Sequence, residues 1–243
     1  MEALTGARLH TPEGFVSGRS LLLESGTIGD IVAEDAIPAG ARITRLAGGT
    51  LAAGFIDLQV NGGGGVMFND APTTATIATI GRAHRVFGTT AFLPTFISGP
   101  RDDMVRAVEA VRGALDRGLP GVLGIHFEGP HINLARCGAH DPRAIAPLGD
   151  DDIDLLASLG VGRTLVTLAP ECVELDHIAT LAARGVIVAA GHTEADAHAF
   201  HMAAPKLSGA THLFNAMSPL GHRELGSAGE ALTRDHLACS IIA

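Results

Sequence analysis

Residues 122–130 read Val-Leu-Gly-Ile-His-Phe-Glu-Gly-Pro, an apolar run that ends at a carboxylate, Glu128. A short apolar run followed by turn-forming residues is typical of a buried β-strand, and Gly129-Pro130 provides the turn. A charged side chain at the last position of such a strand, close to two histidines, is less expected. The strand alone does not explain why a carboxylate lies at position 128, so Glu128 is a candidate functional residue.

Six further apolar runs surround this stretch and alternate with helical patterns. Met104, Val108 and Val111 recur, together with Leu115, at the spacing of one helix face. Strands that alternate with helices predict parallel βαβ units, in which helices cover a sheet whose strands are buried on both faces. The six runs are residues 54–60, 90–94, 164–169, 186–190, 210–214 and 238–242.

Two α/β architectures fit this order of strands and helices. A doubly wound sheet would carry phosphate-binding glycines after its first strand. Asn-Gly-Gly-Gly-Gly follows that strand at residues 61–65, but Gly-x-Gly-x-x-Gly is not met and no clear helix begins there. We therefore predict a (β/α)8 barrel of the TIM type, incomplete with about seven strands, whose chemistry lies at the carboxyl ends of its strands.

The first 50 residues have a different texture from the rest of the chain. Short strand patterns occur at residues 20–24, 26–32 and 41–46, with Gly, Pro and Asp between them and no helical period. We therefore predict two domains, residues 1–50 and residues 51–243.

Charge and composition exclude several classes of protein. The chain carries a formal charge of −9 and has no basic cluster, which argues against a nucleic-acid partner. No apolar run approaches the ~18 residues of a membrane span, and the N-terminus lacks the pattern of a secretory signal. The 3 cysteines are odd in number and far apart, which is typical of the reducing cytoplasm rather than of a disulfide framework. We therefore expect a cytoplasmic protein that binds neither nucleic acid nor membrane.

Carboxylate and imidazole side chains lie at the carboxyl ends of three of the predicted strands. Glu128 closes one run, His192 follows a second, and His212 lies in a third. Each alone has a structural explanation, since Glu128 could cap loop amides and a lone histidine is more often simply hydrogen-bonded. In a barrel, however, the three strand ends converge on one mouth. One carboxylate and two neutral imidazoles therefore predict a divalent-metal site that leaves positions for water and substrate.

The segments that carry these residues resemble the N-acetylglucosamine-6-phosphate deacetylase family of the amidohydrolase superfamily. The resemblance runs from about Gly54 to the last residue. It implies that Glu128, His192 and His212 bind one divalent ion, zinc or iron. It also implies an enzyme that deacetylates N-acetylglucosamine 6-phosphate in amino-sugar catabolism. The motifs are Gly54-Phe-Ile-Asp-Leu-Gln-Val-Asn-Gly62, His126-Phe-Glu-Gly-Pro130, Ala190-Gly-His192 and Thr211-His-Leu-Phe-Asn-Ala-Met217.

The same resemblance implies how a sugar phosphate is held. Asn215, the backbone of Ala216 and the loop position Ala139 match substrate contacts. Arg223 matches a phosphate-binding arginine that reaches across a homodimer interface. The resemblance further implies that residues 1–50 are the N-terminal part of a small β-sandwich, beside an amidohydrolase barrel.

The sequence departs from the family pattern at three places, and these departures change what we expect of the metal count and of the catalytic residues. Gln59 and Asn61 replace the His-x-His of many amidohydrolases, and because amides are poor ligands for transition metals we expect one ion, not two. The family's Arg-Glu-Pro-Gly reads Arg-Glu-Leu-Gly at residues 223–226. The family also continues beyond position 243 with a substrate-contacting histidine and an eighth strand that ends in the catalytic aspartate. We therefore expect the barrel to lack its last strand and the general base to lie outside the chain, and we expect the chain as it stands to be inactive or impaired.

Two other functions stay open. One is a different amidohydrolase, dihydroorotase-like or adenine-deaminase-like, although the Asn-Ala-Met and Gly-His-Arg-Glu pieces favour a sugar phosphate. The other is a catalytically inactive fragment that binds metal or sugar phosphate. The roles of His126, His131 and His140 are also open, and either His126 or His140 could orient the substrate amide.

Overall fold

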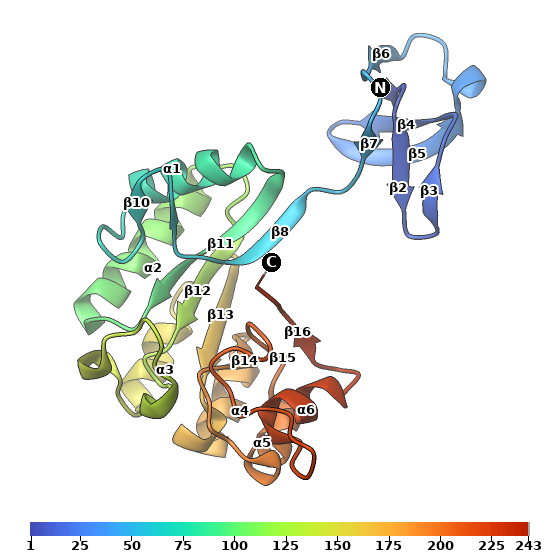
Figure 1. The fold of residues 1–243 in the computed structure, drawn as a ribbon. Coiled ribbons are helices and arrows are strands. Elements are labelled where there is room, and N and C mark those ends of the chain that lie inside the picture. The colour runs from blue at the N-terminus through green and yellow to red at the C-terminus, as the bar shows by residue number, and fades with distance from the viewer. Residues whose placement is uncertain (243) are drawn as a thin grey trace. The chain divides into compact units, whose positions relative to one another are not determined.

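The computed structural model describes residues 1–242, which form two compact units that divide between Gly54 and Phe55 (Figure 1). In the N-terminal unit, seven short strands form two small sheets, with the orders β5-β4-β1-β6 and β3-β2-β7. The strands are β1 (Glu2–Thr5), β2 (Arg8–Thr11), β3 (Gly14–Val16), β4 (Arg19–Glu24), β5 (Thr27–Ala33), β6 (Arg42–Arg45) and β7 (Thr50–Leu51), with a short 3-10 helix η1 (Glu34–Ala36) after β5.

Only three of these strands were expected from the sequence, at β4, β5 and β6. The other four have two to four residues each, which is too short to display the alternation that identifies a strand. In β4 the alternation is visible, because Ser20 and Leu22 are buried while their neighbours are partly or fully exposed.

The C-terminal unit is built on a seven-stranded sheet with the order β16-β15-β14-β13-β12-β11-β8, in which every neighbouring pair is parallel. The sheet curls from β8 at one edge to β16 at the other (Figure 1). The prediction of an α/β barrel with about seven strands is confirmed. The strands are β8 (Phe55–Val60), β11 (Thr89–Ile97), β12 (Gly124–Glu128), β13 (Arg163–Leu168), β14 (Ile187–Ala190), β15 (Gly209–Ala210) and β16 (Ala238–Cys239).

Helices connect successive strands of this sheet, and α1, α2 and α4 pack directly on it. A two-stranded hairpin precedes α1. No helix within residues 1–242 is both long enough and apolar enough to cross a membrane. The α-helices are α1 (Thr74–Arg85), α2 (Arg101–Asp116), α3 (Asp150–Leu156), α4 (Leu175–Ala183), α5 (Ala197–Ala203) and α6 (Gly226–Leu232). The hairpin is β9 (Gly62–Gly63) with β10 (Val66–Met67), and the other 3-10 helices are η2 (Leu134–Arg136), η3 (Pro142–Ala144), η4 (Pro170–Cys172) and η5 (Ala204–Lys206).

Helix α2 shows why these segments are helical. Met104, Val108 and Val111 are buried at the predicted spacing, and Leu115 packs on the same core. Their spacing gives the helix one apolar stripe, which it buries against the sheet and α1. Charged residues fill the opposite, solvated face.

Side-chain alternation places the polar residues of β12 on the inner face of the curled sheet. Ile125 and Phe127 belong to the large core that the strands share with the helices. Successive side chains of a strand point to opposite faces, so His126 and Glu128 face the other way. Glu128, a candidate metal ligand, therefore lies on the inner face of the sheet, and the hydrophobic core lies on the outer face.

Two predicted strands are shorter than their apolar runs. The run at 210–214 is a strand only to Ala210, because His212 and Phe214 have positive φ values of 36° and 73°, which no strand can contain. The run at 238–242 pairs with β15 only through Ala238 and Cys239.

Candidate metal site

Three strands of the sheet deliver the predicted metal ligands to one place. Glu128 is the last residue of β12, and His192 and His212 each lie two residues beyond the ends of β14 and β15. The Nε2 atoms of His192 and His212 lie 3.2 Å and 3.0 Å from Oε1 of Glu128. Residues 64 and 84 positions apart along the chain thus meet at a single carboxylate oxygen.

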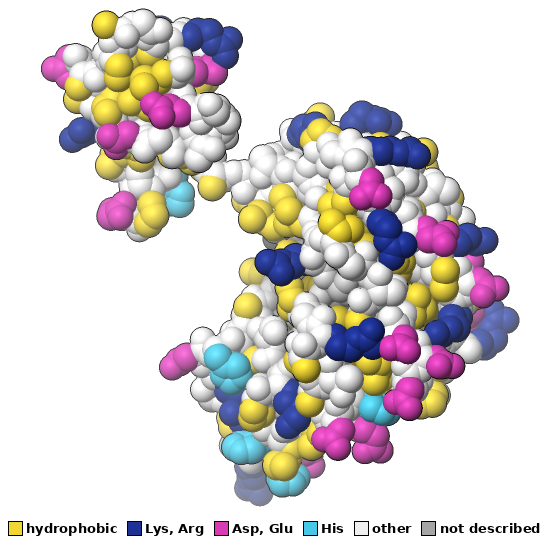
Figure 2. Space-filling model, turned by 180° about the vertical axis from the view of Figure 1, so that it is seen from behind, with side chains coloured by type: hydrophobic (Ala, Val, Ile, Leu, Met, Phe, Trp, Pro, Cys, Tyr) yellow, Lys and Arg dark blue, Asp and Glu magenta, His cyan; other side chains and the backbone are white. Residues whose placement is uncertain are grey.

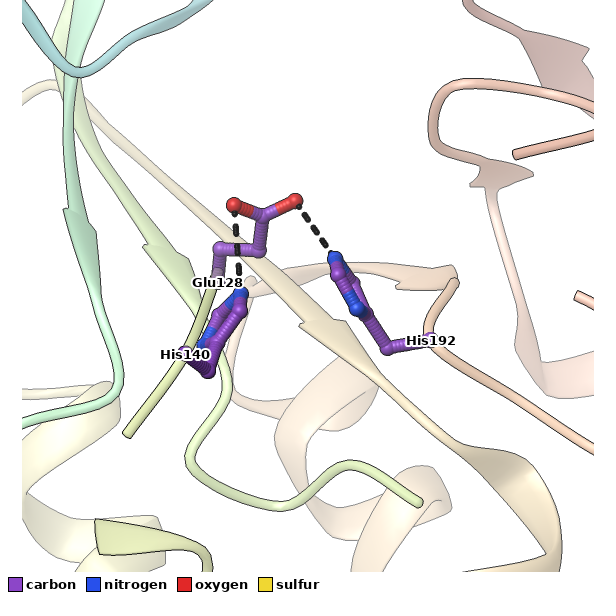
Figure 3. A group of neighbouring side chains, drawn as sticks. All are labelled: Glu128, His140 and His192. Atoms are coloured by element: carbon purple, nitrogen blue, oxygen red, sulfur yellow. Dashed lines mark hydrogen bonds and ion pairs between the residues drawn. The ribbon is translucent and has the colours of Figure 1, made fainter. Parts of the chain in front are cut away.

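Two further side chains complete the cluster. Gln59, from β8, donates a hydrogen bond of 2.7 Å from Nε2 to the same Oε1 of Glu128. His140 comes from the loop after β12 and brings its Nε2 to 3.6 Å from the other oxygen, Oε2 (Figure 3). The amide that replaces a histidine ligand on the first strand therefore holds the carboxylate in place.

A divalent cation suits this group. Potential ligand atoms of Glu128, His140 and His192 all lie within 4.8 Å of one another, and all three residues are buried. Nε2 of His212 lies as close to the carboxylate as Nε2 of His192 does. The site therefore offers three imidazoles around one carboxylate, more than the sequence predicted.

The electrostatics of the cluster keep its carboxylate ionised. Burial raises the pKa of Glu128, but the imidazoles of His140, His192 and His212 lower it more, so its pKa lies far below the usual range. Burial alone would lower the pKa of His212, but its hydrogen bond to Glu128 and the charge of Glu128 raise that pKa overall. A buried anion among nitrogen atoms is an environment in which a cation replaces protons.

Backbone contacts fix the orientation of two of the imidazoles. The Nδ1 atom of His192 lies 2.7 Å from the carbonyl oxygen of Arg136, and Nδ1 of His212 lies 3.1 Å from that of Asn215. A carbonyl oxygen only accepts, so both Nδ1 atoms carry a proton and donate it. In the neutral rings the lone pair is then on Nε2, the atom that faces Glu128.

The backbone is strained where these histidines lie. Five non-glycine residues among residues 1–242 have positive φ, and four of them are His192, His212, Phe214 and Ala216. Such conformations persist where the surrounding structure enforces them, and they concentrate at functional sites.

The residues predicted to hold substrate lie at or near the border of the cluster. Ala139 is exposed and directly precedes His140, while Asn215 is linked to His212 through its carbonyl oxygen. The carbonyl oxygen of Ala216 accepts a hydrogen bond from the backbone N–H of Thr193 and so ties two of the loops together. The side chain of Arg223 is exposed in the segment before α6, and the structure does not bring it to Glu128.

Two of the three histidines whose roles the sequence left open, His126 and His131, make hydrogen bonds that stabilise the fold. His126 is fully buried, with Nδ1 3.3 Å from Oγ1 of Thr95 and Nε2 2.8 Å from Oγ1 of Thr167. Burial lowers its pKa to about 4. His131 is also buried and bonds the carbonyl oxygen of Ala146 through Nδ1. Only His140, of the three, reaches the carboxylate.

Sequence reasoning missed the partner of His140. Ser98, directly after β11, lies 2.7 Å from Nδ1 of His140 through its Oγ atom. Serine is common after strands and gives no signal of its own. Ser98 also lines a cleft of about 640 Å³, together with Arg101 and His131 among others, and none of the cluster residues lines it.

Comparisons with known proteins agree with these motifs and this geometry. No protein-family model matches the chain. It is 46% identical over 199 residues to the N-acetylgalactosamine-6-phosphate deacetylase of Shewanella sp. (strain ANA-3), a match that covers 82% of this chain and 50% of that protein. It is 34% identical over 238 residues to the N-acetylglucosamine-6-phosphate deacetylase of Haemophilus influenzae, over 96% of this chain and 62% of that protein.

A solved structure extends the match to the fold. It is a mutant of N-acetyl-D-glucosamine-6-phosphate deacetylase from Mycobacterium smegmatis in complex with N-acetyl-D-glucosamine-6-phosphate. It matches with a TM-score of 0.85 and 32% identity, over 99% of this chain and 62% of that one. The chain thus spans between 50% and 62% of the length of these relatives. Across that span, the chain belongs to the N-acetylglucosamine-6-phosphate deacetylase family.

Proposed function

We propose that this protein is a metal-dependent deacetylase that hydrolyses N-acetylglucosamine 6-phosphate to glucosamine 6-phosphate and acetate. The observation that carries the proposal is the convergence of His192 and His212, through Nε2, on one oxygen of a buried Glu128. The 46% identity to a relative named for N-acetylgalactosamine 6-phosphate favours a second candidate substrate, which is that epimer.

The proposed ligands are Glu128, His192 and His212, with one divalent ion, zinc or iron, per chain. His140 is close enough to replace His212 in this set, but its protonation argues against it. Its Nδ1 accepts from the backbone N–H of Ser98 at 3.3 Å, so in the neutral ring the proton is on Nε2. A protonated Nε2 has no lone pair to offer, whereas Nε2 of His192 and of His212 has one.

The side chains of the cluster have distinct roles in this proposed reaction. A divalent ion, when bound, supplies polarisation of the acetyl carbonyl and activation of water. Gln59 holds Oε1 of Glu128 through its amide. His140 keeps a proton on Nε2 that it can donate to a substrate oxygen, which stabilises negative charge as it develops. We assign no general base among residues 1–242.

The proposed contacts to the sugar phosphate are Ala139, Asn215, Ala216 and Arg223. A guanidinium suits phosphate oxygens because its fork of donors matches them and its charge persists at any working pH. The exposure of Arg223 is compatible with a contact to a second copy of the chain, and we propose a homodimer. The three free cysteines support a cytoplasmic location.

Metal analysis of single variants tests the ligand set. The purified chain is dialysed against a chelator, reloaded with zinc or iron(II), and its metal content and zinc affinity are measured. We expect about one ion per chain in the wild type and greatly weakened binding in His192→Ala and His212→Ala. His140→Ala is the matched control, an imidazole deleted from the same cluster, and it should keep its ion. Loss of metal in His140→Ala with retention in His212→Ala would reverse the assignment, and two tightly held ions would overturn it.

Acetate release tests the reaction itself. The metal-loaded protein is assayed in parallel with N-acetylglucosamine 6-phosphate, N-acetylgalactosamine 6-phosphate and unphosphorylated N-acetylglucosamine. We expect turnover of the phosphorylated sugars to exceed that of the unphosphorylated one. Acetate release at equal rates from all three sugars, or at a rate that does not depend on the metal, would refute the proposed activity.

A further inference from the structure

The protonation of His140 is set by a residue on a neighbouring strand. Ser98 follows β11, which ends at Ile97, and Ile97 is the register partner of Glu128 across the two parallel strands. Ser98 therefore lies one residue beyond the carboxylate, at the same end of the sheet. Both its backbone N–H and its Oγ face Nδ1 of His140, at 3.3 Å and 2.7 Å.

The backbone N–H decides the direction of these hydrogen bonds. A main-chain N–H can only donate, so Nδ1 of His140 must present a lone pair to it. A proton on Nδ1 would oppose the N–H of Ser98 in a region where both residues are buried. The hydroxyl of Ser98 then also donates to Nδ1, and the ring proton of His140 is on Nε2.

Tight packing holds the hydroxyl in this position. A Cβ atom on Gly129 would lie 2.3 Å from Oγ of Ser98, a distance that real contacts do not reach. Gly129 has a φ of 75°, which favours glycine for a second reason. The glycine after Glu128 thus leaves the space that the serine hydroxyl occupies.

We propose that Ser98 is a positioning residue that holds His140 as a hydrogen-bond donor beside the metal ligands. The imidazoles of the cluster approach different oxygens of the Glu128 carboxylate. Nε2 of His192 and Nε2 of His212 lie 3.2 Å and 3.0 Å from Oε1, whereas Nε2 of His140 lies 3.6 Å from the other oxygen, Oε2. That contact is long for a hydrogen bond, so the N–H can turn from Glu128 to a ligand oxygen at little cost.

The chemical class of that ligand follows from the donor. A single N–H beside a cation site complements an oxygen that carries partial negative charge, such as the carbonyl oxygen of an acetamide. This identification of the ligand rests on the proposed deacetylase function. The protonation state of His140 does not, because it follows from Ser98 alone.

Nitrogen NMR of the histidine rings tests the protonation state without any assay of activity. Long-range 1H–15N spectra are recorded on the 15N-labelled, zinc-loaded chain near pH 8, and His140 is assigned by its loss in His140→Gln. We expect a protonated Nε2 and a bare Nδ1 for His140, and a proton on Nδ1 for His192 and His212. A proton on Nδ1 of His140 would overturn the inference even in an active enzyme. The expected pattern in a protein whose acetate release does not depend on the metal would instead refute the proposed function and leave the role of Ser98 standing.

Substitution of Ser98 tests what the hydroxyl does for the reaction. Ser98→Ala keeps the backbone N–H but loses the shorter hydrogen bond, so kcat should fall about 2- to 10-fold, with metal content and KM little changed. Ser98→Thr retains a hydroxyl and should restore most of kcat. In a His140→Ala background, Ser98→Ala should cause no further loss. A loss of kcat from Ser98→Ala that is as large without His140 as with it would show that Ser98 acts elsewhere.

Discussion

The buried imidazole of His126 makes a quantitative prediction about stability and pH. Its side chain is completely inaccessible to solvent, and burial lowers its pKa from 6.5 to about 4. Between these two values the unfolded chain binds a proton at His126 and the folded chain does not. Stability therefore rises with pH in this window: the contribution is fully present above pH 6.5 and is lost as the pH falls toward 4.

The size of the effect follows from the two pKa values. At about 1.4 kcal/mol for each pH unit, the full window corresponds to about 3 kcal/mol of unfolding free energy. A shift from pH 7.5 to pH 5 crosses most of it, and we expect the metal-free protein to lose about 2 kcal/mol through His126 alone. That is a large share of the 5–15 kcal/mol by which a typical domain is stable.

Urea unfolding followed by circular dichroism at 222 nm measures this loss. The chain has no Trp and no Tyr, so intrinsic fluorescence is a poor probe, while the helical signal reports on the C-terminal unit. His126→Gln removes the titrating ring and keeps a polar group that can reach Thr167. The matched control is His198→Gln, which removes an exposed histidine from α5.

The comparison is between pH dependences, not between absolute stabilities. His126→Gln should be less stable than the wild type at pH 7.5 but should lose about 2 kcal/mol less between pH 7.5 and pH 5. His198→Gln should follow the wild type throughout. If His126→Gln loses as much stability on acidification as the wild type does, burial of His126 is not the cause of the pH dependence.

Three further substitutions test the packing and contacts around the site. Gly191→Ala would place its Cβ 2.4 Å from Oγ1 of Thr211 and 2.6 Å from Cγ2 of Thr167. We expect a loss of roughly 1–3 kcal/mol in urea and weaker zinc binding, because the next residue is a proposed ligand; unchanged values for both would contradict the close packing. Thr167→Val removes the 2.8 Å hydrogen bond to Nε2 of His126 with little change of shape. It should cost about 1–3 kcal/mol, and a neutral result would mean that the bond contributes nothing. Arg223→Ala should leave stability within about 0.5 kcal/mol but raise KM for the 6-phosphate sugar far more than for the unphosphorylated one, and equal losses on both would show no contact with phosphate.

The sequence predicted the parallel sheet because buried strands and amphipathic helices each have a periodicity that can be read locally. Glu128, His192 and His212 could be grouped because the carboxyl ends of parallel strands converge. The runs at 210–214 and 238–242 were read too long, since an apolar pattern does not reveal left-handed residues such as His212 and Phe214. Four short strands of the N-terminal unit escaped detection for a related reason: strands of two to four residues show too little of the alternation that identifies a strand.

The third imidazole of the cluster, His140, could not be assigned from the sequence for a different reason. His140 lies in an irregular loop, and its approach to Glu128 depends on the path of twelve residues after β12 rather than on any periodic signal. A histidine whose Nδ1–H donates to a carbonyl oxygen keeps a lone pair on Nε2 and can bind a metal. A histidine whose Nδ1 accepts from an N–H carries its proton on Nε2 and can act as a donor. Ser98 and Arg136 supply those contacts, and neither residue type is diagnostic in a sequence.

The loop after β12 links the two kinds of imidazole in the cluster. It supplies His140 itself and also the carbonyl oxygen of Arg136, which fixes the proton of His192 on Nδ1. The same loop is bound to the segment after β14, because the N–H of Asn133 donates to the carbonyl oxygen of His192 and Arg136 pairs with Glu194. A shift of this loop would therefore disturb a proposed metal ligand and the proposed substrate donor together. The metal affinity of the cluster and the position of its donor therefore both depend on the path of this loop, and substitutions that displace its backbone between residues 131 and 139 should change both at once.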